Sequence, residues 1–175
     1  MKISAEALIR LSNQHNSIPM YIDGLPAKSV YSQYRDEVPS IHGIIAYLCR
    51  YQHVTLKRQK DICETLNPCF GTYDSRNDPE FDFTMARTTG CLVRELCHFR
   101  GQMISYIQGL PPEHGSRIGT HAVLGTMALS QWLEYFLLHE SRELFRIFKI
   151  ACAIRTDAGD AGTFITISGQ QQKSG

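Results

Sequence analysis

The sequence contains no long apolar run and no cluster of basic residues. No stretch approaches the roughly 20 consecutive apolar residues that a transmembrane helix requires, so we expect no membrane-spanning segment. Lysine and arginine together number 18 against 17 aspartates and glutamates, and the densest basic stretch, Lys57–Lys60, is followed at once by Asp61. Mixed charge of this kind is typical of a solvated helix face. Nucleic acid is therefore not an expected partner.

Several motifs with well-defined chemistry are also missing. The chain has no G-x-S-x-G nucleophile motif, no glycine-rich phosphate loop and no Cys-x-x-Cys pair among its six cysteines. These absences leave no recognisable nucleophile, phosphate-binding or paired Cys/His arrangement. The first residues, Met1–Glu6, lack the apolar core of a signal peptide, so we expect a cytoplasmic protein with reduced cysteines.

Four amphipathic segments make up most of what is present. A hydrophobic fraction of 43% over 175 residues is ordinary for one soluble domain with a sizeable core. Apolar spacing near the helical period predicts four helices, with Ser40 as the N-cap of the second and a short extra turn around Ala27–Tyr34. The predicted helices span residues 3–14, 40–65, 81–108 or 84–108, and 126–154.

Four helices without a convincing sheet predict an all-α fold. We expect an antiparallel four-helix bundle with long loops over residues 1–154. Residues 155–175 form a predicted C-terminal tail, flexible or docked, in which only Phe164–Ile167 has the composition of a short strand or docking contact. The third helix carries small residues almost opposite its apolar stripe, and these fit either a solvent face or close approach of another helix, for instance from a second subunit: Gly90, Cys97, Gly101 and Ser105.

The fourth predicted helix carries His139 and Glu143 on its apolar side. Residues four apart lie one above the other on a helix, so both side chains can converge on one divalent metal. Tyr47, on the second helix, is the polar candidate for a third ligand. The alternative is a core histidine that is hydrogen-bonded to a buried glutamate or to tyrosine. Glu140 lies beside Glu143 and, if both are buried, would raise its pKa as in a general base.

Five short segments occur in an order and spacing that resemble a known family. They are Ser40-Ile41, Ala46-Tyr47-Leu48, Asn77-Asp78-Pro79, Arg117-Ile-Gly-Thr-His121-x-x-x-Gly125-Thr126 and Leu138-His139-Glu140-Ser-Arg-Glu143-Leu144. Together they resemble the DinB/YfiT-like superfamily of four-helix bundles over about residues 35–150. The helix that contains His139 is the most specific part of this resemblance.

The resemblance implies a divalent metal, typically zinc, nickel or iron, held by three histidines. One comes from the second helix between alanine and leucine, and two come from the fourth as His-x-x-x-His. Some relatives use the metal to activate low-molecular-weight thiols, and many are homodimers. In this chain Tyr47 takes the position of the first histidine, His139 that of the second and Glu143 that of the third. The resemblance therefore implies a degenerate metal triad.

Two functions follow from this triad. In one, the chain is a metal-dependent thiol transferase or hydrolase, with His139 as the metal anchor, Glu143 as ligand or base, and Tyr47 as third ligand or proton donor. In the other, the metal site is weakened or lost, and the three side chains form a hydrogen-bond network inside a binding or dimeric scaffold. We favour the second function, because two of three ligands are replaced and a tyrosine ligates well only after losing a proton of pKa about 10.

Two further residue sets have their own interpretations. Trp132, Phe136 and Tyr51 fit either an apolar cleft that binds a small molecule without turnover or ordinary core packing. His121, in the segment before the fourth helix, is expected to cap or brace the turn, with a place at the pocket rim as the alternative.

Overall fold

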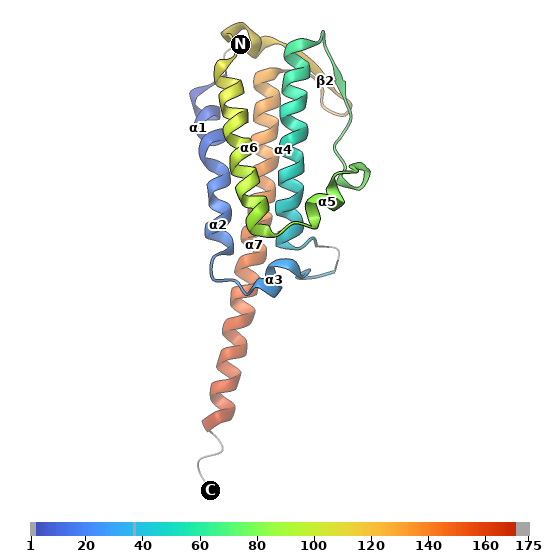
Figure 1. Ribbon diagram of the computed structural model, residues 1–175. Helices are drawn as coiled ribbons and strands as arrows, with labels where there is room; N and C mark the ends of the chain where they lie inside the picture. The colour runs from blue at the N-terminus through green and yellow to red at the C-terminus, as the bar shows by residue number, and fades with distance from the viewer. Residues whose placement is uncertain (1–2, 37, 171–175) are drawn as a thin grey trace.

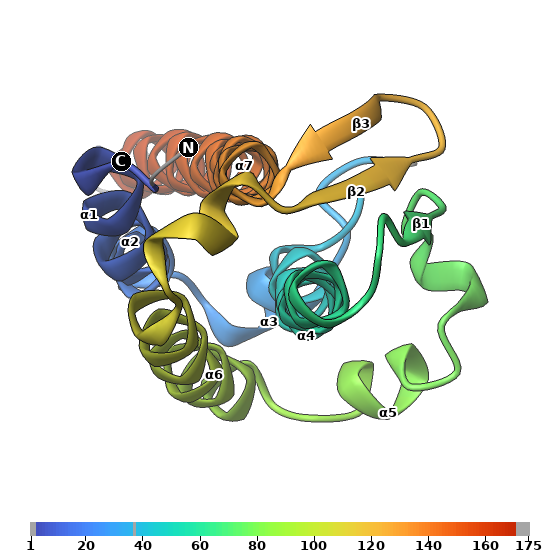
Figure 2. The same ribbon diagram turned by 90° about the horizontal axis from the view of Figure 1, so that it is seen from above.

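The computed structural model describes the backbone of residues 3–36 and 38–170 and the side chains as far as Asp157 (Figure 1). Its main helices are α1 (Ala5–Asn13), α2 (Ser17–Ile22), α4 (Ile41–Glu64), α6 (Thr89–Gly109) and α7 (Leu129–Gln170). The shorter elements are α3 (Ala27–Tyr31), α5 (Phe81–Met85), three 3-10 turns and the strands β1 (Cys69–Phe70), β2 (Ile118–His121) and β3 (Gly125–Ala128). α1 and α2 follow one another as a broken rod, so four rods form the bundle (Figure 2).

Side-chain caps explain where two of the long helices begin. The Ser40 hydroxyl accepts a hydrogen bond from the Gly43 amide at 3.0 Å, which confirms Ser40 as the N-cap of α4. Thr88 caps α6 in the same way through the Cys91 amide. α6 begins at this cap, after α5 has ended at Met85, so the single helix predicted over 81–108 or 84–108 is two helices.

The prediction of an antiparallel bundle is wrong for two pairs of rods. α1 and α2 run parallel to α7, since Arg10 pairs with Glu134 and Tyr21 packs on Phe148 further along. α4 and α6 also run parallel. His42 contacts Thr89 at 2.9 Å near the two N-termini, and Gln52 donates to the Leu96 carbonyl further along both helices. Parallel neighbours need a long crossover between them. Residues 65–88 supply it along the outside of the bundle, on the side of α4 and the small sheet (Figure 1).

A three-stranded sheet corrects the prediction of a purely all-α fold. β1 pairs parallel with β2, and β2 pairs antiparallel with β3. Gly125 has a φ of 75° at the end of the three-residue β2–β3 turn, a conformation that glycine adopts without strain. His121 Nδ1 accepts the amides of Val123 and Leu124 at 3.1 and 3.2 Å, as expected for a residue that braces this turn. Since β3 occupies residues 125–128, α7 begins three residues later than predicted.

α7 continues beyond the other helices (Figure 1). It runs to Gln170, so the segment Phe164–Ile167 is helical where a short strand was one expectation. The predicted end of the fourth helix at residue 154 is therefore wrong. Residues 171–175 of the predicted tail lie outside the described residues, and the domain boundary at residue 154 stays a prediction. Among the described residues, no helix is both long and apolar enough to cross a membrane.

The small residues on α6 lie on its solvent-exposed side. Cys91, next to Gly90, is half-buried. Gly90, Cys97, Gly101 and Ser105 are all exposed, which fits the solvent-face interpretation within this chain. Large apolar side chains are also exposed on α7, namely Leu138, Phe145 and Phe148. Association as a homodimer stays a prediction.

A buried ion pair joins the four rods at mid-height. The side chains of Arg100 on α6 and Glu140 on α7 are each only 1% exposed and form a salt bridge. Arg100 also donates to Gln52 Oε1 of α4 at 2.7 Å and to the Leu11 carbonyl of α1 at 2.9 Å. Gln14 donates to the same Glu140 carboxylate at 2.9 Å. A charge in the core is tolerated only with such partners, so this network holds the helices in one register.

Arg100→Met should lower the free energy of unfolding by about 3–5 kcal/mol, because it leaves the Glu140 carboxylate buried without its counter-charge. Urea unfolding measures the effect. Glu134→Gln is the matched control: it breaks the exposed Arg10–Glu134 pair and should cost about 1 kcal/mol or less. Equal losses in the two variants would contradict the proposed importance of the buried pair.

The same network predicts a loss of stability in acid. Burial and the Arg100 charge lower the pKa of His15 from 6.5 to about 4. Between these two values the unfolded chain binds a proton at His15 that the folded chain does not, so stability falls as the pH drops through this window. We expect the urea concentration at half-unfolding to be lower at pH 4.5 than at pH 7. This difference should be smaller in His15→Gln. A fall of the same size in both proteins would rule out this contribution.

Candidate functional site

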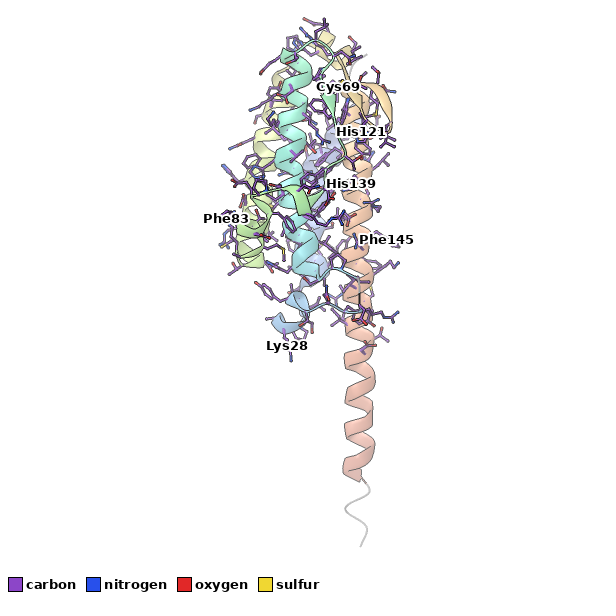
Figure 3. All side chains as sticks on the ribbon, turned by 90° about the vertical axis from the view of Figure 1, so that its right-hand side faces the viewer. Lys28, Cys69, Phe83, His121, His139 and Phe145 are labelled. Carbon is purple, nitrogen blue, oxygen red and sulfur yellow. The ribbon has the colours of Figure 1, made fainter. Side chains whose placement is uncertain are left out.

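Tyr47 and His139 meet between α4 and α7. The Tyr47 hydroxyl lies 3.0 Å from His139 Nε2. The two helices run in opposite directions, so residues from the middle of each face one another. In Figure 3, His139 lies below His121 along α7. The structure therefore brings together two of the three residues that the sequence singled out.

Burial sets the protonation states of this pair. Burial, and then the nearby Glu143 carboxylate, raise the pKa of Tyr47 to about 12. Burial, and then the Arg142 charge, lower the pKa of His139 to about 4. At neutral pH the phenol is protonated and the imidazole is neutral, so the hydrogen bond joins two uncharged groups.

Aromatic side chains surround the pair. Tyr51 stacks on Tyr47 with ring centroids 5.8 Å apart and lies 4.4 Å from the His139 ring. Tyr73, from the crossover, lies 5.5 Å from Tyr47. Its hydroxyl donates to Asp78 at 2.9 Å, and Asp78 also accepts two hydrogen bonds from Arg50 of α4. The Asn77-Asp78-Pro79 segment thus ties the crossover to α4 and positions Tyr73 over the site.

Glu143 is buried one turn further along α7, with 2% of its side chain exposed. One carboxylate oxygen accepts from Arg142 at 2.9 and 3.1 Å, and the other accepts from Arg146 at 2.6 Å. Glu140 is paired separately with Arg100. Each of the two buried carboxylates therefore has its own guanidinium partners, and a mutual effect of Glu140 and Glu143 stays a prediction.

A cavity of about 550 Å³ opens beside Tyr47 and Glu143. It lies between the start of α4, the helix α5 and the middle of α7. Trp132, Phe136 and Tyr51, the residues expected to line an apolar cleft, are instead buried in the core. Trp132 donates its indole N–H to the Gly119 carbonyl at 3.1 Å, which fixes it beneath the sheet. The cavity is therefore lined by residues other than those of the expected cleft.

Comparison with solved structures identifies the fold. The chain matches YfiT from Bacillus subtilis with a TM-score of 0.76, over 87% of this chain and 90% of that one, at 15% sequence identity. The chain therefore has the fold of YfiT. YfiT is described as a probable metal-dependent hydrolase with an unusual four-helix bundle topology. At this identity the likeness concerns the fold alone. A scan of protein families and a search of curated proteins find no match.

In this YfiT-like bundle, the side chains at the three positions implied to hold a divalent metal are engaged by other groups. In one tautomer His139 Nε2 accepts the Tyr47 proton, and in the other it carries the ring proton itself. Its lone pair is therefore not free in either tautomer. Both Glu143 oxygens are bound by guanidinium groups, whose charges also oppose a cation. Within the side chains described, no group of three His, Cys, Asp or Glu residues is placed to hold a metal.

Arg142 and Arg146 are site residues that no sequence motif singled out. A signal was present, because both flank Glu143 at spacings of one and three residues on a predicted helix. This spacing does not stand out, because arginines near a glutamate on a helix usually form surface salt bridges. Burial of Glu143 makes the difference, since a buried carboxylate must be paired.

Tyr47→Phe should lower the free energy of unfolding by about 1 kcal/mol, because it removes the only hydroxyl that the structure places against His139 Nε2 among the described residues. Tyr34→Phe is the matched control: its hydroxyl bonds the exposed Asp157 at 3.0 Å, so its loss should cost less. Chemical denaturation compares the two. A Tyr47 variant as stable as wild type would show that the hydrogen bond contributes nothing.

Proposed function

We propose that this chain is a small-molecule-binding protein that works without a metal on a YfiT-like bundle. One observation carries the proposal: at the three positions where the family resemblance implies metal ligands, the side chains satisfy one another or adjacent arginines. Tyr47 bonds His139, and Glu143 bonds Arg142 and Arg146. A cavity of suitable size for a small molecule lies directly beside them.

The physical cost of placing a metal in this network supports the proposal. Binding would require the Tyr47–His139 bond to break and Tyr47, with its pKa raised to about 12, to lose a proton. It would also require the Glu143 carboxylate to leave its two guanidinium partners. Each of these changes opposes binding, and a metal would have to compensate for all of them.

A second function is favoured by the meeting of Tyr47 with His139 and by the description of YfiT as a probable metal-dependent hydrolase. In it, the chain is a metal-dependent hydrolase or thiol transferase with a zinc, nickel or iron ion between α4 and α7. His139 anchors the metal, Glu143 serves as ligand or base, and Tyr47 is the third ligand or a proton donor.

Metal measurements separate the two functions. We expect untagged wild-type protein to purify without stoichiometric zinc, nickel or iron, and its melting temperature to stay unchanged on adding either zinc or a chelator. Stoichiometric metal that disappears in His139→Ala would overturn the first proposal in favour of the second.

A double variant provides the positive control for these measurements. Tyr47→His combined with Glu143→His replaces the phenol and the carboxylate by imidazoles, which are good zinc ligands at neutral pH. This variant should be stabilised by zinc, by about 2.7 kcal/mol when zinc is at 100 times its Kd. If it gains no stability, the three positions do not converge as a ligand set.

A further inference from the structure

We propose that the cavity beside Tyr47 binds a small organic anion, with the anionic group held by Arg142 and Arg146 and an apolar body packed against α4 and α5. This inference rests on the proposed function and names the chemical class of its ligand. It gives Glu143 the role of a positioning residue for two arginines.

The charge of the cavity is the first argument. Among the described lining residues, the ionised groups are Arg142, Arg146 and Glu143, so two positive charges face one negative charge. The single carboxylate is already engaged by both guanidinium groups. A cavity of about 350 Å³ adjoins it across Arg146 and adds Arg35 and Lys149 to its lining. The region therefore attracts an anion and repels a cation.

The geometry of the two arginines is the second argument. Glu143 is held rigidly in the core, and its two oxygens fix one guanidinium each, at 2.9 and 2.6 Å. These bonds leave other N–H donors free on both side chains, because a guanidinium presents a planar fork of several donors. Arg142 and Arg146 remain 67% and 39% exposed, so a ligand can reach them. Preorganised donors bind an anion with less loss of side-chain entropy than free arginines do.

The opposite wall of the cavity is apolar. Ile44 of α4 and Phe81 and Met85 of α5 line it, with Tyr31 at its edge. The N-terminus of α4 opens on the same space through Ser40 and Gly43, and the positive end of a helix dipole adds to the attraction for an anion. A ligand with an anionic group at the arginines and a flat apolar body at Phe81 and Met85 matches a cavity with one charged wall and one apolar wall.

The test compares an acid with its neutral amide. We expect 3-phenylpropionate to bind wild-type protein at least about tenfold more tightly than 3-phenylpropanamide by isothermal titration calorimetry. Binding of the acid should weaken as salt is raised. Inorganic phosphate, which lacks the apolar body, should bind more weakly than the acid.

Variants locate the site. Arg142→Gln should weaken binding of the acid by about tenfold while leaving the amide unaffected. This variant keeps the fold testable, because Arg146 still pairs with the buried Glu143. Arg10→Gln is the matched control on another face, where Arg10 pairs with Glu134, and should bind like wild type. Circular dichroism melting checks that each variant is folded.

Each outcome decides the inference. Equal affinity for acid and amide, or undiminished binding of the acid by folded Arg142→Gln, overturns it and leaves the metal-independent function intact. Failure of every probe to bind wild type also overturns it. Retention of a metal on His139 overturns the proposed function instead, and elemental analysis reads this separately.

Discussion

The Arg100–Glu140 ion pair is the constraint on which the arrangement of the bundle depends. Its two charges lie in the core, so they must be matched in position as well as in sign. Arg100 reaches α1, α4 and α7 from α6 and leaves little freedom for any helix to slide. Glu140 is the sequence neighbour of His139, and its position on α7 therefore sets where His139 faces α4. The geometry of the candidate site follows from an interaction that is not part of it.

The sequence predicts the helices better than it predicts how they are arranged. Ser40 and the apolar stripe after it are local signals, and α4 begins and ends within one residue of the prediction. The parallel course of α4 and α6 depends on distant partners such as His42 with Thr89, which no local pattern reports. The sheet was missed for the same reason. β1 is only two residues long, and Gly119 of β2 matters because a Cβ there would lie 2.8 Å from an Ile62 side-chain carbon.

The candidate site was predictable as far as helix geometry reaches. The spacing of His139 and Glu143 and the family resemblance of Tyr47 led to the right face of each helix, and Tyr47 and His139 do meet. The partner of each charged group was not predictable. Glu140 and Glu143 look alike in the sequence, yet one pairs across the core with α6 and the other with arginines of its own helix. This choice depends on which side chains reach the carboxylates in three dimensions.

The parallel course of α4 and α6 has a consequence for how such a pocket is built. A chain that leaves the far end of α4 and starts α6 at the near end has to travel the full length of the bundle. This connecting segment places Tyr73 against Tyr47, and its residues Phe81 and Met85 line one wall of the cavity. The cavity is thus enclosed because α4 and α6 run parallel and need this long connection. Substitutions in residues 65–88 can change the shape of the cavity, and so which ligands fit it, without changing how the four rods pack.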